Sequence, residues 1–351
     1  MRVVGDATER LGRHPSPSVR VSPAQPRLET TGSVLWPASQ GLAAVPDGNR
    51  SAVVPSVTAD IGGRTFFLSV KGIGARTPAY GEGWGVGRVL TSESWFGHAP
   101  FGAQGEVDGA KGLEITALAT GTSIQGFHIC PVLSVAELPA ELVRNVHGKF
   151  NYRRYTGTVL QEQRLVPSNI RLHNDSELTL GRAPGATLDA LGVTDGEGFL
   201  QNLLASGFAA LTLWSRSLRE GPHGLEGLDF STVWLDKDSV LGADGTLHFA
   251  DLEGLEWRPL AGSDLQARVQ EPFDRNYYEL MYAADALIAV LEAREGRGRG
   301  PSERRRAMAS RIALALGGDP VITVEHRTES LDLVVRGADC RLVRLRAIDL
   351  G

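Results

Sequence analysis

The sequence predicts an α+β protein whose first half is rich in β-strands and whose second half is mainly helical. Before residue 175, β-branched and aromatic residues occur in short runs that Gly, Pro and Asp-Gly-Asn interrupt, which is typical of strands. After about residue 186, apolar residues recur at helical spacing. The 351 residues exceed the roughly 100–200 residues of one domain core, so we expect two lobes. We place the β-rich N-lobe at 31–175 and the helical C-lobe at 176–351.

The first 30 residues are rich in Pro, Ser and Arg and have little periodicity, so we expect a disordered tail. Strand-like runs share β-branched or aromatic residues and are expected at 33–46, 51–61 and 64–74. Residues 72–108 form a glycine-rich and aromatic insertion within the N-lobe. A long segment of this kind inside a compact region is usually functional.

The remainder of the N-lobe is expected to hold a helix at 110–121 and strands within 126–138 and 158–173. The helices expected in the C-lobe have an apolar face or are apolar throughout, and they lie at 187–192, 199–221, 277–295 and 307–316. An Arg/Gly stretch at 296–306 is predicted to be a solvated, flexible loop, and 321–348 returns to strand-like alternation. One hairpin, at 233–254, is embedded among the helices.

Composition argues against several classes of partner. The formal net charge is -5, whereas a general nucleic-acid binder normally has a concentrated basic face. No stretch approaches the roughly 20 apolar residues that span a membrane, and the N-terminal residues lack the apolar core of a signal peptide. Cys130 and Cys340 are far apart and lack a metal-binding pattern, so we expect two buried thiols in a reducing cytoplasm.

The hairpin carries the most informative pattern. Asp238 precedes its first strand and Asp251 follows its second, with Asp236 and Glu253 close by. A short hairpin brings its two ends together, and Mg²⁺ is commonly held by one or two carboxylates together with phosphate oxygens. The hairpin is therefore predicted to be a metal site. The alternative is that Asp251 caps the following turn and that Asp238 is an ordinary polar residue at the start of a strand.

The order of these features resembles the protein-kinase-like superfamily, including its aminoglycoside-phosphotransferase-like and selenoprotein O-like branches. Asp251-Leu252-Glu253-Gly254 is similar to the DFG or DxE magnesium motif of that superfamily. Lys71 resembles the lysine of its third strand, and Glu114 resembles the helix glutamate that pairs with that lysine. His223-Gly224 resembles the opening of its catalytic loop.

This resemblance implies a two-lobed protein-kinase-like fold that uses ATP and Mg²⁺. Asp238 and Asp251 would bind the metal, Lys71 would bind the nucleotide phosphates, and Glu114 would orient Lys71. The implied partners are a nucleotide and an unidentified protein, peptide or small-molecule acceptor, without nucleic acid or membrane.

The sequence departs from the family pattern in four places, the first of which is a loop between His223 and Asp238 that is longer than usual. Asp238 stands where an asparagine is expected, and Val233 occupies the place of the catalytic aspartate, so Asp229 or Asp236 would have to orient the acceptor. The glycine-rich loop between the first two strands is missing. The segment GEGWGVGR, which includes Arg88, could partly replace it by directing backbone N–H groups and a guanidinium at phosphates.

Two functions follow from this pattern. The first is an atypical kinase-like transferase that moves a phosphoryl or nucleotidyl group. The alternative is a non-catalytic, pseudokinase-like scaffold that keeps the fold to bind a partner. A third interpretation, an α+β protein unrelated to kinases, holds if the hairpin match is accidental.

Overall fold

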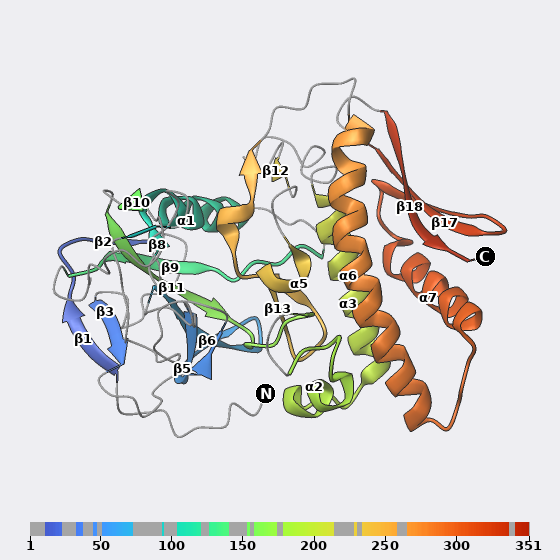
Figure 1. The fold of residues 1–351 in the computed structure, drawn as a ribbon, viewed down its shortest axis with the longest axis horizontal. Coiled ribbons are helices and arrows are strands. Elements are labelled where there is room, and N and C mark those ends of the chain that lie inside the picture. Colours follow the sequence, from blue (N-terminus) through green and yellow to red (C-terminus); the bar gives the residue numbers. More distant parts are fainter. Residues whose placement is uncertain are drawn as a thin grey trace. The chain divides into compact units, whose positions relative to one another are not determined.

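The computed structural model describes residues 11–22, 33–37, 45–47, 51–72, 93–94, 104–120, 126–139, 153–154, 158–173, 178–213, 228–229, 234–257, 265–336 and 341–350. The predicted α+β class is confirmed, with strands concentrated before residue 167 and long helices after residue 183 (Figure 1). The chain forms two compact units. We call Val3–Thr120 with Cys130–Asn169 the sheet unit, and Gly121–Ile129 with Ile170–Gly351 the helical unit. The division at residue 169 lies near the predicted boundary at 175, but residues 121–129 belong to the second unit.

The sheet unit is built on a seven-stranded sheet in the order β2-β9-β11-β6-β5-β4, with β8 also paired to β11. All of these pairs are antiparallel. The strands are β2 (Val19–Val21), β4 (Val45–Pro46), β5 (Ser51–Ile61), β6 (Arg64–Lys71), β8 (Gln104–Gly105), β9 (Val132–Glu137) and β11 (Val159–Val166). Helix α1 (Glu106–Thr120) connects β8 to the segment before β9 and packs on β9 and β11.

The two faces of this sheet differ in polarity because successive residues of a strand point to opposite faces. On one face Phe66, Leu68 and Val70 of β6 belong to a buried apolar cluster that also contains Leu35 and Leu165. Lys71, on the alternate position of β6, is also buried. The sheet is therefore covered on both faces, and its second face holds buried charges.

A separate ribbon of two strands, β1 (Leu11–Pro15) and β3 (Ser33–Pro37), is held to the apolar face through glutamine side chains. Gln161 accepts from Leu35 N–H at 2.8 Å and donates to Leu35 C=O at 2.7 Å. Gln163 donates to Ser33 C=O at 2.6 Å. These bonds satisfy the buried amide of Gln161 and the amide nitrogen of Gln163, which would otherwise oppose folding. Strands β1 and β2 correct the prediction of a disordered tail at 1–30, because residues 11–21 pair with other strands despite their Pro and Arg content.

The helical unit contains α2 (Pro184–Leu191), α3 (Gly196–Leu211), the short α5 (Leu235–Asp238), α6 (Leu265–Arg294) and α7 (Pro301–Leu316). Asp195 caps α3 by accepting from Gly198 N–H at 2.9 Å. Helix α3 packs against α6 and α7 (Figure 1). A Cβ at Gly207 would overlap Leu280, so α3 and α6 approach closely at this glycine.

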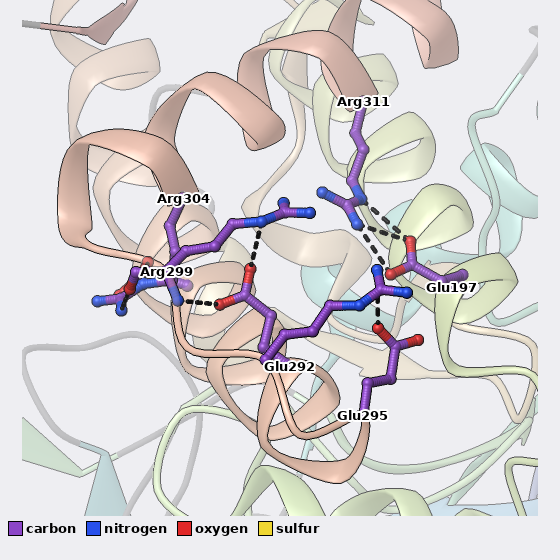
Figure 2. A network of polar contacts seen from close by, with 8 residues as sticks. Glu197, Glu292, Glu295, Arg299, Arg304 and Arg311 are labelled. Carbon is purple, nitrogen blue, oxygen red and sulfur yellow. Dashed lines mark hydrogen bonds and ion pairs between the residues drawn. The ribbon is translucent and has the colours of Figure 1, made fainter.

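Ion pairs fix the turn between α6 and α7 and the contact of α7 with α3 (Figure 2). Glu292, at the end of α6, lies 3.5 Å from Arg299 Nε and accepts from Arg299 N–H at 3.4 Å. Arg311 of α7 makes a bidentate pair with Glu197 of α3, with the shortest distance 2.8 Å. The predicted flexible loop at 296–306 is therefore wrong in its second half, because α7 begins at Pro301, a favourable first helical residue.

The remaining strands are short pairs and a C-terminal sheet. They are β7 (Glu93–Ser94) with β10 (Arg153–Arg154), β12 (Leu228–Asp229) with β15 (Glu256–Trp257), β13 (Ser239–Leu241) with β14 (Leu247–Phe249), and the sheet of β16 (Ile322–His326), β17 (Ser330–Arg336) and β18 (Leu342–Asp349). A 3₁₀ turn, η4 (Leu252–Gly254), follows β14. Among the described residues, no helix is long and apolar enough to cross a membrane.

Candidate functional site

The predicted hairpin forms as the pair β13–β14, and its turn depends on two residues. Asp244 Oδ1 accepts from Thr246 N–H at 3.1 Å, and Gly245 N–H donates to Gly242 C=O at 3.0 Å. Gly245 has φ 89°, which favours glycine. Its position against the Phe199 backbone of α3 leaves no room for a Cβ. The turn chemistry and the packing both fix the register that places the aspartates at the open end.

At the open end of the hairpin the backbone brings Asp238 and Asp251 together. The Asp238 carbonyl accepts from Ala250 N–H at 2.8 Å and from Asp251 N–H at 3.1 Å. Asp238 is the last residue of α5, and its Oδ2 accepts from Trp234 N–H at 2.7 Å. The predicted juxtaposition of these two aspartates is therefore present in the helical unit.

Asp238 is 9% exposed, and burial together with the nearby Asp251 charge raises its pKa from 3.8 to about 6. The Trp234 hydrogen bond, Lys237 and Arg171 act in the opposite direction. Arg171 is buried and donates to the Lys237 carbonyl. The two carboxylates repel each other where water is partly excluded. A divalent cation bound between them would relieve this repulsion.

The alternative role for Asp251, as a cap for the following turn, does not match its geometry. Asp251 occupies the N-cap position of η4, yet its side chain makes no capping hydrogen bond. Glu253 lies within η4 and is partly exposed.

In the sheet unit, Lys71 ends β6 and is only 2% exposed. The residue directly opposite Lys71 on β11 is Glu162, which is 3% exposed. Directly opposed residues in an antiparallel pair point to the same face, with Cβ atoms about 4.5–5.5 Å apart. The carboxylate next to Lys71 is thus that of Glu162.

Glu114 does not make the predicted pair with Lys71. Its side chain is exposed, because the face of α1 that meets the sheet carries Gly109, Gly112 and Thr116, and Glu114 lies on the opposite side of the helix. A Cβ at Gly112 would lie 3.2 Å from Glu162 Oε2. Gly112 of α1 therefore leaves space for the side chain of Glu162 on β11.

Lys71 and Glu162 lie beside a buried ionic network. Arg164 Nη1 is 3.5 Å from Glu162 Oε1, and Arg164 Nη2 is 3.6 Å from Asp47 Oδ2. Ser69 donates to the same Asp47 oxygen at 3.4 Å. The alternation of amides and charges in Gln161-Glu162-Gln163-Arg164 could have indicated a strand with polar groups on both buried faces.

Asp236, one of the two candidates for orienting an acceptor, lies on α5 in a group with His173 and Glu279. Burial, followed by the charge of Asp236, raises the pKa of the Glu279 carboxyl, while His173 acts in the opposite direction. Neither His173 nor Glu279 was predicted from the sequence, since they are distant in sequence and belong to no spaced motif.

Three predicted features are not described in full. Asp229 pairs through its backbone with Glu256 in β12–β15, but its side chain lies outside the described atoms. Arg88, most of the 72–108 insertion and His223-Gly224 lie outside the described residues. Cys130 is buried, as predicted, and Cys340 is also outside the described residues.

No protein-family model matches this chain, and no curated protein or solved structure shows significant similarity to it.

Proposed function

We propose that this chain is an atypical kinase-like transferase that uses ATP and Mg²⁺ to move a phosphoryl or nucleotidyl group to a protein, peptide or small-molecule acceptor. The observation that carries the proposal is the approach of Asp238 and Asp251 at the open end of the β13–β14 hairpin. In this proposal both carboxylates bind Mg²⁺.

The donor set fits a magnesium ion. Mg²⁺ requires hard oxygen ligands in a near-octahedral shell and is usually bound by one or two carboxylates, waters and phosphate oxygens. Asp238 and Asp251 supply two such carboxylates, and the pKa of Asp238 near 6 leaves it mostly ionised at neutral pH. The bound ion would neutralise charge on the transferring phosphate.

Lys71 supports the proposal through its place in the chain. It ends β6, and the helix α1 follows it after the short strands β7 and β8, so a helix comes after the strand that carries the lysine, as the resemblance implies. In this proposal Lys71 binds the nucleotide phosphates, and Glu162 replaces Glu114 as the carboxylate next to it. Asp229 or Asp236 would orient the acceptor.

One observation favours the alternative, a non-catalytic scaffold. Lys71 is almost fully buried and faces Glu162, so its charge has a structural neighbour without any nucleotide. Asp238 in place of asparagine also departs from the family pattern. A scaffold of this kind would bind its partner without turnover of ATP.

Nucleotide turnover separates the two candidates. Purified protein is incubated with ATP and Mg²⁺, and the products are resolved by chromatography. Phosphoryl transfer predicts ADP, whereas nucleotidyl transfer predicts AMP or a nucleotidylated product with pyrophosphate. Asp251→Asn should abolish either product, because it removes a metal ligand while retaining the size of the side chain.

Glu303→Gln, at an exposed position in the first turn of α7, is the matched control and should leave turnover unchanged. Turnover that persists in Asp251→Asn would contradict the proposal. Nucleotide binding without turnover in the wild type would favour the scaffold.

A further inference from the structure

We propose that His173, Asp236 and Glu279 form a second metal site in the helical unit, one that binds a divalent transition-metal ion of the zinc class. One ligand atom from each of the three side chains can be chosen so that all lie within 4.8 Å of one another. The residues come from three places in the chain: the segment after β11, helix α5 and helix α6. This site does not depend on the proposed transferase function, and it leaves Asp229 as the residue that would orient the acceptor there.

The backbone around the group is fixed by hydrogen bonds from neighbouring residues. His173 N–H donates to the Asp236 carbonyl at 3.4 Å. Leu235, next to Asp236, donates its N–H to Asn276 Oδ1 at 2.8 Å. Asn276 is almost fully buried and lies one helical turn before Glu279 on α6. These hydrogen bonds hold together the three segments that carry the candidate ligands, and they do not use the atoms that would bind the ion.

The ligand atoms themselves have unused bonding capacity. Asp236 Oδ1 is buried and has no hydrogen-bond partner within the described parts of the chain. His173 Nδ1 lies 3.9 Å from Glu279 Oε2, which is longer than a hydrogen bond. A buried carboxylate oxygen without a partner is costly, and a cation between these atoms would satisfy it.

The ligand types select the metal. An imidazole nitrogen with two carboxylate oxygens suits Zn²⁺ and similar transition metals, whereas Mg²⁺ prefers oxygen ligands alone. Zinc–ligand distances of about 2.0–2.2 Å place tetrahedral ligands roughly 3.4 Å apart. Small side-chain rotations would close the group to that spacing. All three side chains are partly exposed, which leaves room for water as a fourth ligand.

The test is calorimetric titration of Zn²⁺ into the full-length chain after removal of metals with a chelator. One equivalent should bind to the wild type, and affinity should fall at least tenfold in His173→Ala and in Glu279→Gln. The matched controls are His326→Ala on β16 and Glu271→Gln on α6, both at exposed positions, and they should bind as the wild type does. Asp251→Asn should also retain the zinc, since the hairpin carboxylates form a different site.

X-ray absorption at the zinc edge gives an independent readout and should show one histidine nitrogen among oxygen ligands. Circular dichroism and thermal unfolding of each metal-free variant show whether the substitution has disturbed the fold. Absence of zinc binding by the wild type would overturn the proposal, as would equal affinity of the wild type and both folded site variants, or an absorption spectrum with sulfur ligands.

Discussion

The burial of Asp238 beside Asp251 makes the stability of the helical unit depend on pH. Because the folded-state pKa is raised from 3.8 to about 6, the unfolded chain ionises first as pH rises. The contribution of Asp238 to the free energy of unfolding is therefore highest below pH 4 and decreases between about pH 4 and pH 6. The decrease amounts to at most about 3 kcal/mol, at roughly 1.4 kcal/mol per pKa unit.

Asp238→Asn should remove this dependence, because an amide does not ionise but still accepts the Trp234 hydrogen bond. Without metal, the variant should match the wild type near pH 4 and exceed its unfolding free energy by about 1–3 kcal/mol at pH 7. Urea unfolding across this pH range measures the difference. A constant difference at every pH would show that Asp238 titrates normally.

Arg164 is expected to be the most sensitive charged residue of the sheet unit. Arg164→Met should lower the unfolding free energy by about 3–5 kcal/mol, since it removes a buried guanidinium that lies 3.6 Å from Asp47 and 3.5 Å from Glu162. Arg346→Met is the matched control. Its pair with Asp349 spans 3.1 Å but both side chains are largely exposed, so its loss should cost less than about 1 kcal/mol. Equal losses, measured by chemical denaturation, would contradict the assignment of a buried network.

At this scale the sequence predicted the pair Asp238 and Asp251 but not the partner of Lys71. The aspartates flank one short hairpin, so their approach follows from local pairing. The neighbour of Lys71 depends on strand register, which follows from tertiary packing. Glu114 had suitable sequence spacing, but the glycines of α1 direct the opposite face of that helix to the sheet.

Among the elements, the β13–β14 turn has the strictest requirement for glycine. Gly245→Ala should destabilise the helical unit by more than about 2 kcal/mol, because the added Cβ meets both an unfavourable φ of 89° and the Phe199 carbonyl carbon at 2.8 Å. Gly192→Ala at the end of α2 shares a positive φ, 68°, but has no atom within 4 Å of the added Cβ. It should cost only about 1 kcal/mol.

Urea unfolding of the two glycine variants isolates the contact with α3. If both variants lose the same amount, φ alone explains the effect and the hairpin is not held against Phe199. If Gly245→Ala unfolds earlier, the packing of the turn on α3 is part of what positions the aspartates.

Several elements were predicted from the sequence because their signals are local. The hairpin, α1, α3 and the C-terminal strands follow from turn residues and periodicity. Helix α6 begins at Leu265, well before the predicted Tyr277, and it contains Pro272, a residue that usually ends or kinks a helix. Strands β1 and β2 were not predicted. Strand β1 pairs with β3 and strand β2 pairs with β9, so their formation depends on partners outside the local sequence.

At the scale of the whole molecule, the chain forms a sheet unit and a helical unit whose boundaries do not follow the order of the sequence. Residues 121–129 follow α1 of the sheet unit yet belong to the helical unit, where Phe249 N–H donates to His128 C=O at 3.0 Å. Such a crossover leaves no periodic signal in the sequence. Of the residues in the proposed function, Asp238 and Asp251 belong to the helical unit and Lys71 belongs to the sheet unit.

The central claim is that Asp238 and Asp251 bind Mg²⁺ together with a nucleotide. The most direct measurement is thermal unfolding of the wild type and Asp251→Ala with ATP, with and without Mg²⁺, beside the control Glu303→Gln. At a hundredfold excess over its dissociation constant, a ligand that binds only the native state stabilises it by about 2.7 kcal/mol. We expect a magnesium-dependent rise in the unfolding midpoint for the wild type and the control that is lost in Asp251→Ala. No rise in the wild type, or an equal rise in Asp251→Ala, would contradict the claim.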